Sequence, residues 1–208
     1  MKTALKYAGI ALFLVATFAT IGYLFWKQEV QYTLPTPIPK DYSLVYVNQE
    51  VHLNNYYNQT VAIPTLYHFF NPECPCSRFN LKHYNSLKRK YSDSIRFIVV
   101  IPEFADIDLV KDYFDGDTNV IRDLNRALAN ELGVYSTPQA AIINRESKLY
   151  YRGNYNKARY CTDPGSNFTQ MAIDSLLAGA SPPAFGLLST VSYGCGLEDK
   201  SENLFSMF

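Results

Sequence analysis

Cys74 and Cys76 are the residues whose type and spacing most directly suggest chemistry, because only Pro75 separates them. The apolar run before them ends in Asn-Pro, and a polar segment compatible with a helix follows at once. This order predicts a buried strand, a tight turn and then a helix. Backbone N–H groups at a helix N-terminus favour a thiolate over a thiol, and a proline in the first turn forfeits no helical hydrogen bond. We therefore expect redox chemistry at this pair of cysteines.

The two cysteines have different expected roles. Cys74 is the expected nucleophile, since the turn would bring it nearest to solvent, and Cys76 would resolve a mixed disulfide from within the helix. Two structural cysteines are one alternative. A Cu(I) site is another, because thiolates are soft ligands that a histidine such as His68 or His83 could complete. Every histidine precedes residue 84, so the later part of the chain offers no histidine to such a site.

Cys161 and Cys195 bring the number of cysteines to four, and an even number suits an oxidising compartment. The simplest expectation is a structural disulfide between Cys161 and Cys195, which would pin a C-terminal tail, residues 181–208, to the rest of the chain. Two alternatives stay open. Either cysteine could exchange with Cys74 as a second redox relay, or the thiols could be free or bonded between molecules.

The composition limits the class of partner. The 208 residues include 19 basic and 19 acidic side chains, so the chain lacks the excess of positive charge that binds nucleic acid. The length suits one domain with appendages.

The N-terminus carries a strongly apolar segment. No charged residue occurs from Tyr7 to Trp26, and about 20 such residues span a hydrocarbon core. We expect residues 1–27 to form a transmembrane anchor whose N-terminus stays in the cytoplasm, because lysines precede the apolar run. A cleaved signal peptide is the main alternative and a buried soluble helix the lesser one. Residues 28–43 are rich in proline and are expected to form an extended spacer.

Residues 44–180 show the pattern of a folded domain. Within this range, residues 44–53 suggest a strand pair. We then expect strands at 63–70, 95–101, 139–144 and 148–152, and helices from the cysteines to about 91, at 106–114 and at 168–177. Ile121, Leu124, Leu128 and Leu132 form a stripe at helical spacing that Gly133 ends. The order of strands and helices predicts an α/β mixed sheet with helices on both faces.

This order, with two cysteines after the first strand and Thr137-Pro138 just before the hairpin, resembles the thioredoxin superfamily. A closer resemblance is to little-characterised, membrane-anchored bacterial thioredoxin-like proteins with a Cys-Pro-Cys motif. It rests on residues 71–80 and 176–179 and on Gly194-Cys195. The resemblance implies that Pro138 is cis, that Thr137 contacts the sulfurs, and that this loop pairs with the backbone of a substrate peptide.

The sequence departs from thioredoxins at the motif itself. Thioredoxins carry Cys-x-x-Cys, whereas one residue separates Cys74 from Cys76. Such a disulfide would close a small strained ring, so it would be either reactive or difficult to form. Thioredoxin-like peroxidases need Thr or Ser three residues before the reactive cysteine. Asn71 and Glu73 stand at those positions, which argues against a peroxidase.

The sequence thus predicts a membrane-anchored thioredoxin-like domain in the periplasm or an equivalent exterior space. Its expected activity is thiol–disulfide exchange with exported proteins through Cys74 and Cys76. Substrate contacts are expected at Thr137 and Pro138. No organic cofactor and no resident metal is implied, and a membrane thiol reductase is a plausible partner. A copper-delivery module and a redox-inactive adaptor are the remaining hypotheses.

Overall fold

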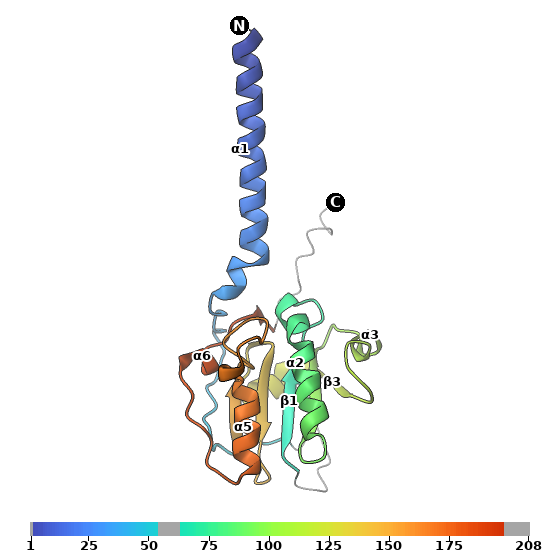
Figure 1. The fold of residues 1–208 in the computed structure, drawn as a ribbon. Coiled ribbons are helices and arrows are strands. Elements are labelled where there is room, and N and C mark those ends of the chain that lie inside the picture. Colours follow the sequence, from blue (N-terminus) through green and yellow to red (C-terminus); the bar gives the residue numbers. More distant parts are fainter. Residues whose placement is uncertain (1, 54–62, 198–208) are drawn as a thin grey trace. The chain divides into compact units, whose positions relative to one another are not determined.

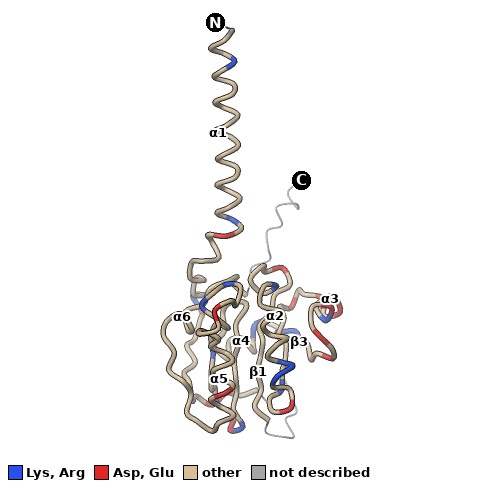
Figure 2. The backbone as a smooth tube through the Cα atoms, viewed as in Figure 1, with Lys and Arg blue, Asp and Glu red and all other residues tan. Residues whose placement is uncertain are grey.

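The computed structural model describes residues 2–53 and 63–197, and the chain divides into two compact units, Met1–Leu34 and Pro35–Phe208. The first unit holds helix α1 (Lys2–Gln28) and the 3-10 turn η1 (Val30–Thr33). Within the described residues, only α1 and the turn after it are long and apolar enough to cross a membrane. Figure 2 shows charged residues only near the two ends of α1. The unit is therefore consistent with a membrane anchor or a signal sequence.

The second unit is built on a mixed sheet. Among the described residues this sheet has five strands in the order β3-β2-β1-β5-β6. Strand β1 pairs in parallel with β2 and antiparallel with β5, and the parallel pair β2–β3 and the antiparallel pair β5–β6 extend it on either side. In chain order the elements are β1 (Thr65–Phe69), α2 (Pro75–Tyr91), β2 (Arg96–Pro102), α3 (Ile107–Lys111), β3 (Asn119–Asp123), η2 (Leu124–Arg126), α4 (Ala127–Leu132), β4 (Ser136–Thr137), β5 (Gln139–Ile143), β6 (Leu149–Gly153), η3 (Pro164–Ser166), α5 (Phe168–Leu177), α6 (Leu187–Thr190) and β7 (Cys195–Gly196).

Apolar side chains cover both faces of the sheet. Successive residues of a strand point to opposite faces, so β1 contributes Leu66 to one core and Tyr67 to the other. Helices α2 and α5 pack on the face of Leu66, where Figure 1 shows them side by side, while α4 packs on the face of Tyr67. The structure confirms the predicted thioredoxin-like α/β sheet with helices on both faces.

Part of the expected helix at residues 121–132 is a strand. Residues 119–123 form β3, whose Ile121 pairs with Val100 of β2, and only 127–132 are α-helical. Asn125 and Arg126 both have positive φ values and interrupt the helix. Ile121 and Leu124 recur at helical spacing with Leu128 and Leu132, so the sequence pattern predicted a helix where the edge strand β3 forms.

The expected strand pair at residues 44–53 is not formed either. Asn48 turns the chain with a φ of 68°, and the residues after it run beside the β5–β6 hairpin. Glu50 forms an isolated bridge with Lys148, and the backbone N–H of Leu149 donates to Gln49 at 2.9 Å. Hydrogen bonds to the hairpin therefore replace those expected within the segment.

Parts of two segments expected to be appendages, residues 35–43 and 181–197, belong to the folded unit. Residues of the spacer, 28–43, pair with the C-terminal segment: Pro35 bridges Tyr193, and the Thr36 N–H donates to Ser192 O at 2.8 Å. The expected tail, 181–208, contributes α6 and β7, and its residues 198–208 lie outside the described residues. The side-chain amide of Asn154 donates to Leu188 O and Val191 O at 2.9 and 2.6 Å. Ser192 is fully buried. The C-terminal segment is thus held against the domain up to this residue.

Candidate functional site

The turn between β1 and α2 is shaped by Asn71. Its carbonyl oxygen accepts from the N–H of Cys74 at 3.0 Å, and its side-chain oxygen accepts from the N–H of Glu73 at 3.0 Å. Cys74 is the residue that caps α2, with extended φ and ψ of −82° and 118°, and Pro75 begins the helix. The structure therefore puts Cys74 at the helix N-terminus, as the sequence predicts.

Cys74 is bonded to Cys195. The S–S distance is 2.11 Å, the Cα–Cα distance is 6.0 Å, and 121 positions separate the two residues in sequence. The expected pairing of Cys161 with Cys195 is wrong in this structure, and no bond joins Cys74 to Cys76. Cys76 is a buried thiol on the first turn of α2.

Cys161 lies in the segment between β6 and η3, where its side chain contacts α2 rather than Cys195. Its sulfur is 3.0 Å from the side-chain oxygen of Asn80, one helical turn beyond Cys76. Burial raises the pKa of the Cys161 thiol to about 12. A thiol held so strongly in its protonated form is a poor nucleophile at neutral pH.

The short strand β4 lies beside the disulfide. Its partner is β7, with Thr137 opposite Cys195 and Ser136 opposite Gly196 in an antiparallel pair. The Thr137-Pro138 peptide bond is cis, as predicted. The carbonyl oxygen of Thr137 is 3.6 Å from Cys74 Sγ, so the expected contact between Thr137 and a sulfur is present. The chain's own C-terminal segment occupies the strand position that the resemblance assigns to a substrate peptide.

Gly194 allows this close approach. Its φ is 144°, and a Cβ atom at this position would lie 2.2 Å from the Thr137 carbonyl oxygen. Side chains rarely adopt this backbone conformation, and the contact would be a severe overlap. Gly194 was not predicted to have a role, although a glycine directly before a cysteine is a usable sign of such an approach.

Both bonded cysteines are buried, which corrects the expectation that Cys74 lies nearest to solvent. Cys74 is 2% exposed and Cys195 is 7% exposed. Because β7 pairs with β4 directly beside Cys74, the C-terminal segment covers the sulfur. A partner molecule can therefore reach Cys74 in full only when β7 moves aside.

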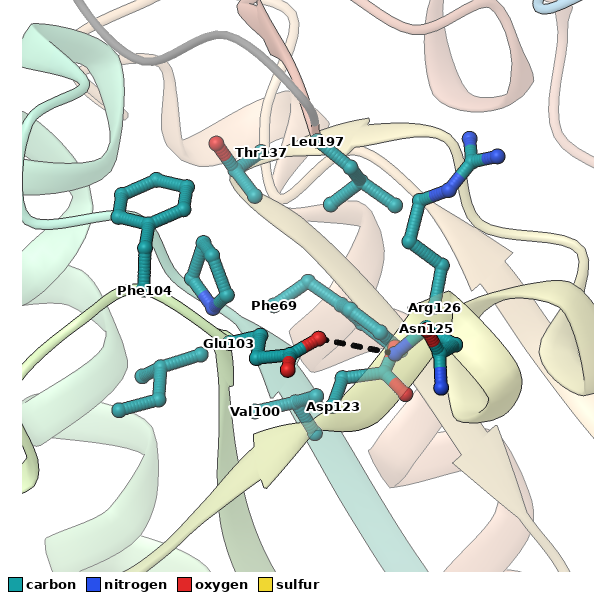
Figure 3. Close-up of a pocket in the computed structure, with 11 residues that line it drawn as sticks. Phe69, Val100, Glu103, Phe104, Asp123, Asn125, Arg126, Thr137 and Leu197 are labelled. Atoms are coloured by element: carbon teal, nitrogen blue, oxygen red, sulfur yellow. Dashed lines mark hydrogen bonds between the residues drawn. The ribbon is translucent and has the colours of Figure 1, made fainter.

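A cavity of about 360 Å³ opens next to β4 and β7. Figure 3 shows Phe104 on one side and Leu197 with Arg126 on the other. Phe69 and Val100 contribute apolar surface from the sheet, and Thr137 connects the cavity to the disulfide. Sequence reasoning missed this cavity, because its wall comes from five separate parts of the chain.

Carboxylates also line the cavity. Glu103 Oε2 accepts from the backbone N–H of Asn125 at 3.4 Å, marked by a dashed line in Figure 3. Asp123 accepts from the N–H groups of Leu128 and Ala129 at 2.8 and 2.9 Å. Burial raises the pKa of Asp123, and these two hydrogen bonds act in the opposite direction. The cavity therefore has an apolar floor and carboxyl groups on its wall, together with the guanidinium of Arg126, which is paired with Asp41 at 2.9 Å.

A second buried polar group lies beneath α2. His68 Nδ1 is 2.8 Å from the Tyr155 hydroxyl, and burial lowers the pKa of His68 to about 3. His68 and His83 each keep a buried Nε2 with no hydrogen-bond partner among the described residues. Outside the masked ranges 54–62 and 198–208, no group of three or more His, Cys, Asp or Glu side chains could hold a metal ion.

Comparison with protein families gives one match. Residues 44–196 match the model of a domain of unknown function, DUF6436. The chain belongs to this family. The matched range includes both members of the disulfide, so Cys74 and Cys195 lie within the DUF6436 domain. No curated protein matches the chain.

Solved structures similar to this DUF6436 protein show the same fold. A hypothetical protein from Sinorhizobium meliloti is 15% identical with a TM-score of 0.62, covering 76% of this chain and 96% of its own. An uncharacterised protein from Geobacillus kaustophilus is 18% identical with a TM-score of 0.61, covering 79% and 98%. A secreted Mycobacterium tuberculosis disulfide oxidoreductase homologous to E. coli DsbE is 12% identical with a TM-score of 0.42, covering 57% and 83%. That last likeness is too weak to support a function.

Proposed function

We propose that this protein is a membrane-anchored thiol–disulfide oxidoreductase that acts on exported proteins, with Cys74 as the exchanging cysteine and Cys195 as its resolving partner. The observation that carries the proposal is the Cys74–Cys195 disulfide, which joins a helix N-terminus to a strand beside a cis-proline loop. A purely structural bond does not need a cysteine at a helix N-terminus, where a thiolate is stabilised.

The exchange begins with the oxidised protein. A substrate thiolate attacks the sulfur of Cys74, the bond to Cys195 breaks, and Cys195 leaves as a thiolate. A second substrate thiolate then attacks the substrate sulfur of the mixed disulfide and releases Cys74 as a thiolate. The substrate has lost two electrons and two protons, and the protein has gained them as two thiols. The reverse sequence reduces a substrate disulfide.

Cys195 is the better-supported resolving residue because it stays close after the bond opens. The contacts of Asn154 with Leu188 and Val191 anchor the chain before Ser192. Only a short stretch then connects this anchor to Cys195, so the local concentration of its thiol near Cys74 is high. The role expected for Cys76 stays a prediction, and it is tested by comparing the release of substrate by Cys76→Ser with that by Cys195→Ser.

The location of the activity follows from the apolar N-terminal helix. An uncleaved α1 would hold the domain on the outer side of the membrane, where disulfides persist. Partners there would be exported proteins with thiols or disulfides, and a membrane thiol reductase or oxidase that resets the pair. Tethering raises the concentration of the domain near such partners.

The proposal is tested with the full-length protein in detergent micelles. The measured quantities are the rate of insulin disulfide reduction with dithiothreitol and the rate of oxidation of a dithiol peptide. Cys74→Ser is expected to abolish both rates, and Cys195→Ser is expected to reduce them at least about tenfold and to accumulate a mixed disulfide. Cys161→Ser serves as the matched control and is expected to retain the wild-type rates.

Full activity of Cys74→Ser in both assays would overturn the exchange mechanism. A wild-type protein that is inactive in both assays but binds exported proteins in either redox state would favour the adaptor hypothesis. Stoichiometric, tight binding of Cu(I) by the reduced protein without exchange would favour the copper hypothesis.

A further inference from the structure

We propose that β7 and the residues beside it are an internal copy of the preferred substrate, and that the cavity beside Thr137 binds the side chain two positions after the substrate cysteine. The chemical class of partner is an extended polypeptide of the form Gly-Cys-x-Leu, in which an apolar residue takes the last place. This inference rests on the proposed function, since it assigns the sequence that Cys74 selects.

The register of β7 gives the template. Cys195 lies opposite Thr137 in an antiparallel pair, and its sulfur reaches Cys74. A substrate strand that replaces β7 in the same register places its cysteine where Cys195 lies. The backbone hydrogen bonds of β4 then hold the peptide, and pockets for its side chains give specificity.

Gly194 defines the position before the cysteine. A Cβ atom there would lie 2.2 Å from the Thr137 carbonyl oxygen, which belongs to rigid backbone beside the cis-proline. The φ of 144° is also strained for any residue with a side chain. A substrate that follows this register therefore favours glycine before its cysteine.

Leu197 defines the second position after the cysteine. Leu197 follows β7 directly, in a turn two positions after Cys195. Leu197 lines that cavity and packs against the apolar core. Figure 3 shows its side chain directed toward Phe69, with Phe104 across the remaining space. The unfilled volume of about 360 Å³ admits a side chain at least as large as leucine.

The charged groups on the wall of the cavity determine which substrate side chains are excluded from it. Glu103 and Asp123 place carboxyl groups on the wall, and both hydrogen-bond to backbone N–H groups of the following segment. An acidic side chain in the same cavity would lose its hydration and meet these carboxyl groups. The guanidinium of Arg126 also lies on the wall, but it is already ion-paired with Asp41 at 2.9 Å. Leucine is therefore expected to be preferred over aspartate at this position.

The test uses the full-length protein in detergent with Cys76→Ser and Cys195→Ser, so that Cys74 reacts alone at the site. Three peptides, Gly-Cys-Gly-Leu, Gly-Cys-Gly-Asp and Ala-Cys-Gly-Leu, are supplied as mixed disulfides with thionitrobenzoate. The Cys74 thiolate attacks the peptide sulfur, a peptide–Cys74 disulfide forms, and the coloured thionitrobenzoate anion leaves. Its absorbance gives the rate, and the same protein with Cys74→Ser gives the background.

The peptide with leucine and glycine is expected to react about tenfold faster than the aspartate peptide, the ratio that burial of one apolar side chain supplies. The alanine peptide is expected to react more slowly as well.

Phe104→Ala should reduce the preference for leucine. Phe79→Ala is the matched control, since Phe79 is 40% exposed and Phe104 is 38% exposed but only Phe104 lines the cavity. Leu197→Gly removes the resident side chain and should speed the reaction of the leucine peptide.

The failures of the two proposals are distinguishable. Equal rates for all three peptides above the Cys74→Ser background would overturn the cavity assignment and leave the exchange activity intact. Rates at the background for every peptide would show that Cys74 does not exchange, which would remove the proposed function as well. A leucine preference that survives Phe104→Ala but is lost in Phe79→Ala would place the subsite elsewhere and overturn the assignment.

Discussion

Cys74 and Gly194 show how individual residues determine the site. Cys74 is fixed by the hydrogen bonds of Asn71 at the start of α2, and Gly194 lets the C-terminal segment come close enough to bond to it. Neither residue would suffice alone, because the sulfur of Cys195 must reach Cys74 Sγ, which lies 3.6 Å from the Thr137 carbonyl oxygen.

Gly194→Ala is expected to weaken the Cys74–Cys195 bond. The added Cβ would overlap the Thr137 carbonyl oxygen, at a cost of about 1–3 kcal/mol in the oxidised state. In the reduced state the strand can move away, so the cost is smaller there. The measurement is the fraction of disulfide formed in glutathione buffers of graded composition, and the variant should need more oxidising buffers.

Gly186→Ala is the matched control for this substitution. Gly186 has a φ of −74° and open space around its Cβ position, so its disulfide equilibrium should remain that of the wild type. An unchanged equilibrium in Gly194→Ala would contradict the proposed tight approach.

His68 makes a second prediction, for the dependence of stability on pH. Burial lowers its pKa to about 3, whereas an unfolded histidine has a pKa of about 6.5. Between these values the unfolded chain binds a proton that the folded chain does not, so stability falls as the pH falls. From about pH 7 to about pH 5 this loss is about 2 kcal/mol.

The measurement compares urea unfolding of Tyr155→Phe with that of the double variant His68→Phe/Tyr155→Phe, because the Tyr155 hydroxyl contacts His68. The double variant should lose about 2 kcal/mol less than the single variant over this pH range. Equal losses would mean that His68 is protonated inside the fold.

At this scale the sequence predicted that Cys74 lies at a helix N-terminus and, through the resemblance, that the Thr137-Pro138 bond is cis. The catalytic role of Cys74 and the substrate contacts of Thr137 and Pro138 stay predictions. It did not predict that Cys195 pairs with Cys74. That pairing depends on the path of residues 181–195 across the domain, which no local pattern encodes. Cys161 was the expected partner of Cys195 because the number of cysteines is even. That number says nothing about the distance between any two of them in the fold.

The elements around the site owe their positions to a few connections. Strand β1 delivers the chain to α2, and β4 receives β7 at its outer edge. The strong elements β1, α2, β2, β5, β6 and α5 were predictable because each has continuous apolar residues or a clear helical stripe. Strand β3 was not, because its residues fit a helical stripe with Leu128 and Leu132, and the positive φ of Asn125 that separates the two elements leaves no clear sign in sequence.

Asp123 connects β3 to α4 and supplies a third prediction. Its two carboxylate oxygens accept from the N–H groups of Leu128 and Ala129. Asp123→Ala removes both acceptors and is expected to lower the free energy of unfolding by about 1–2 kcal/mol. Asp108→Ala is a fair comparison, since its side chain makes only an exposed contact with Lys111, and it should change stability by about 0.5 kcal/mol or less. Equal effects would contradict the capping role.

On the scale of the whole domain, the disulfide closes a long loop. The two cysteines are separated by 121 positions. The bond therefore restricts the conformations of most of this domain when it is unfolded. The sequence predicted the domain but treated residues 28–43 and 181–208 as appendages. Their place in the fold depends on contacts between segments distant in sequence, such as those of Thr36 with Ser192 and of Asn154 with Val191, and the pairing of β7 with β4.

Reduction is therefore expected to lower stability. Loop entropy predicts a loss of about 3–5 kcal/mol in the free energy of unfolding of the oxidised protein. Cys195→Ser should unfold alike with and without reductant, whereas Cys161→Ser should keep the full difference. Loss of the difference in Cys161→Ser, measured by chemical unfolding in both buffers, would mean that Cys161 is the true partner in solution.

The central claim is that Cys195, rather than Cys76, releases substrate from Cys74. The most direct measurement traps mixed disulfides by acid quenching and alkylation during reaction with a disulfide protein, followed by mass spectrometry. Cys195→Ser is expected to accumulate substrate bonded to Cys74, while Cys76→Ser releases it at the wild-type rate. Accumulation in Cys76→Ser with normal release in Cys195→Ser would contradict the claim.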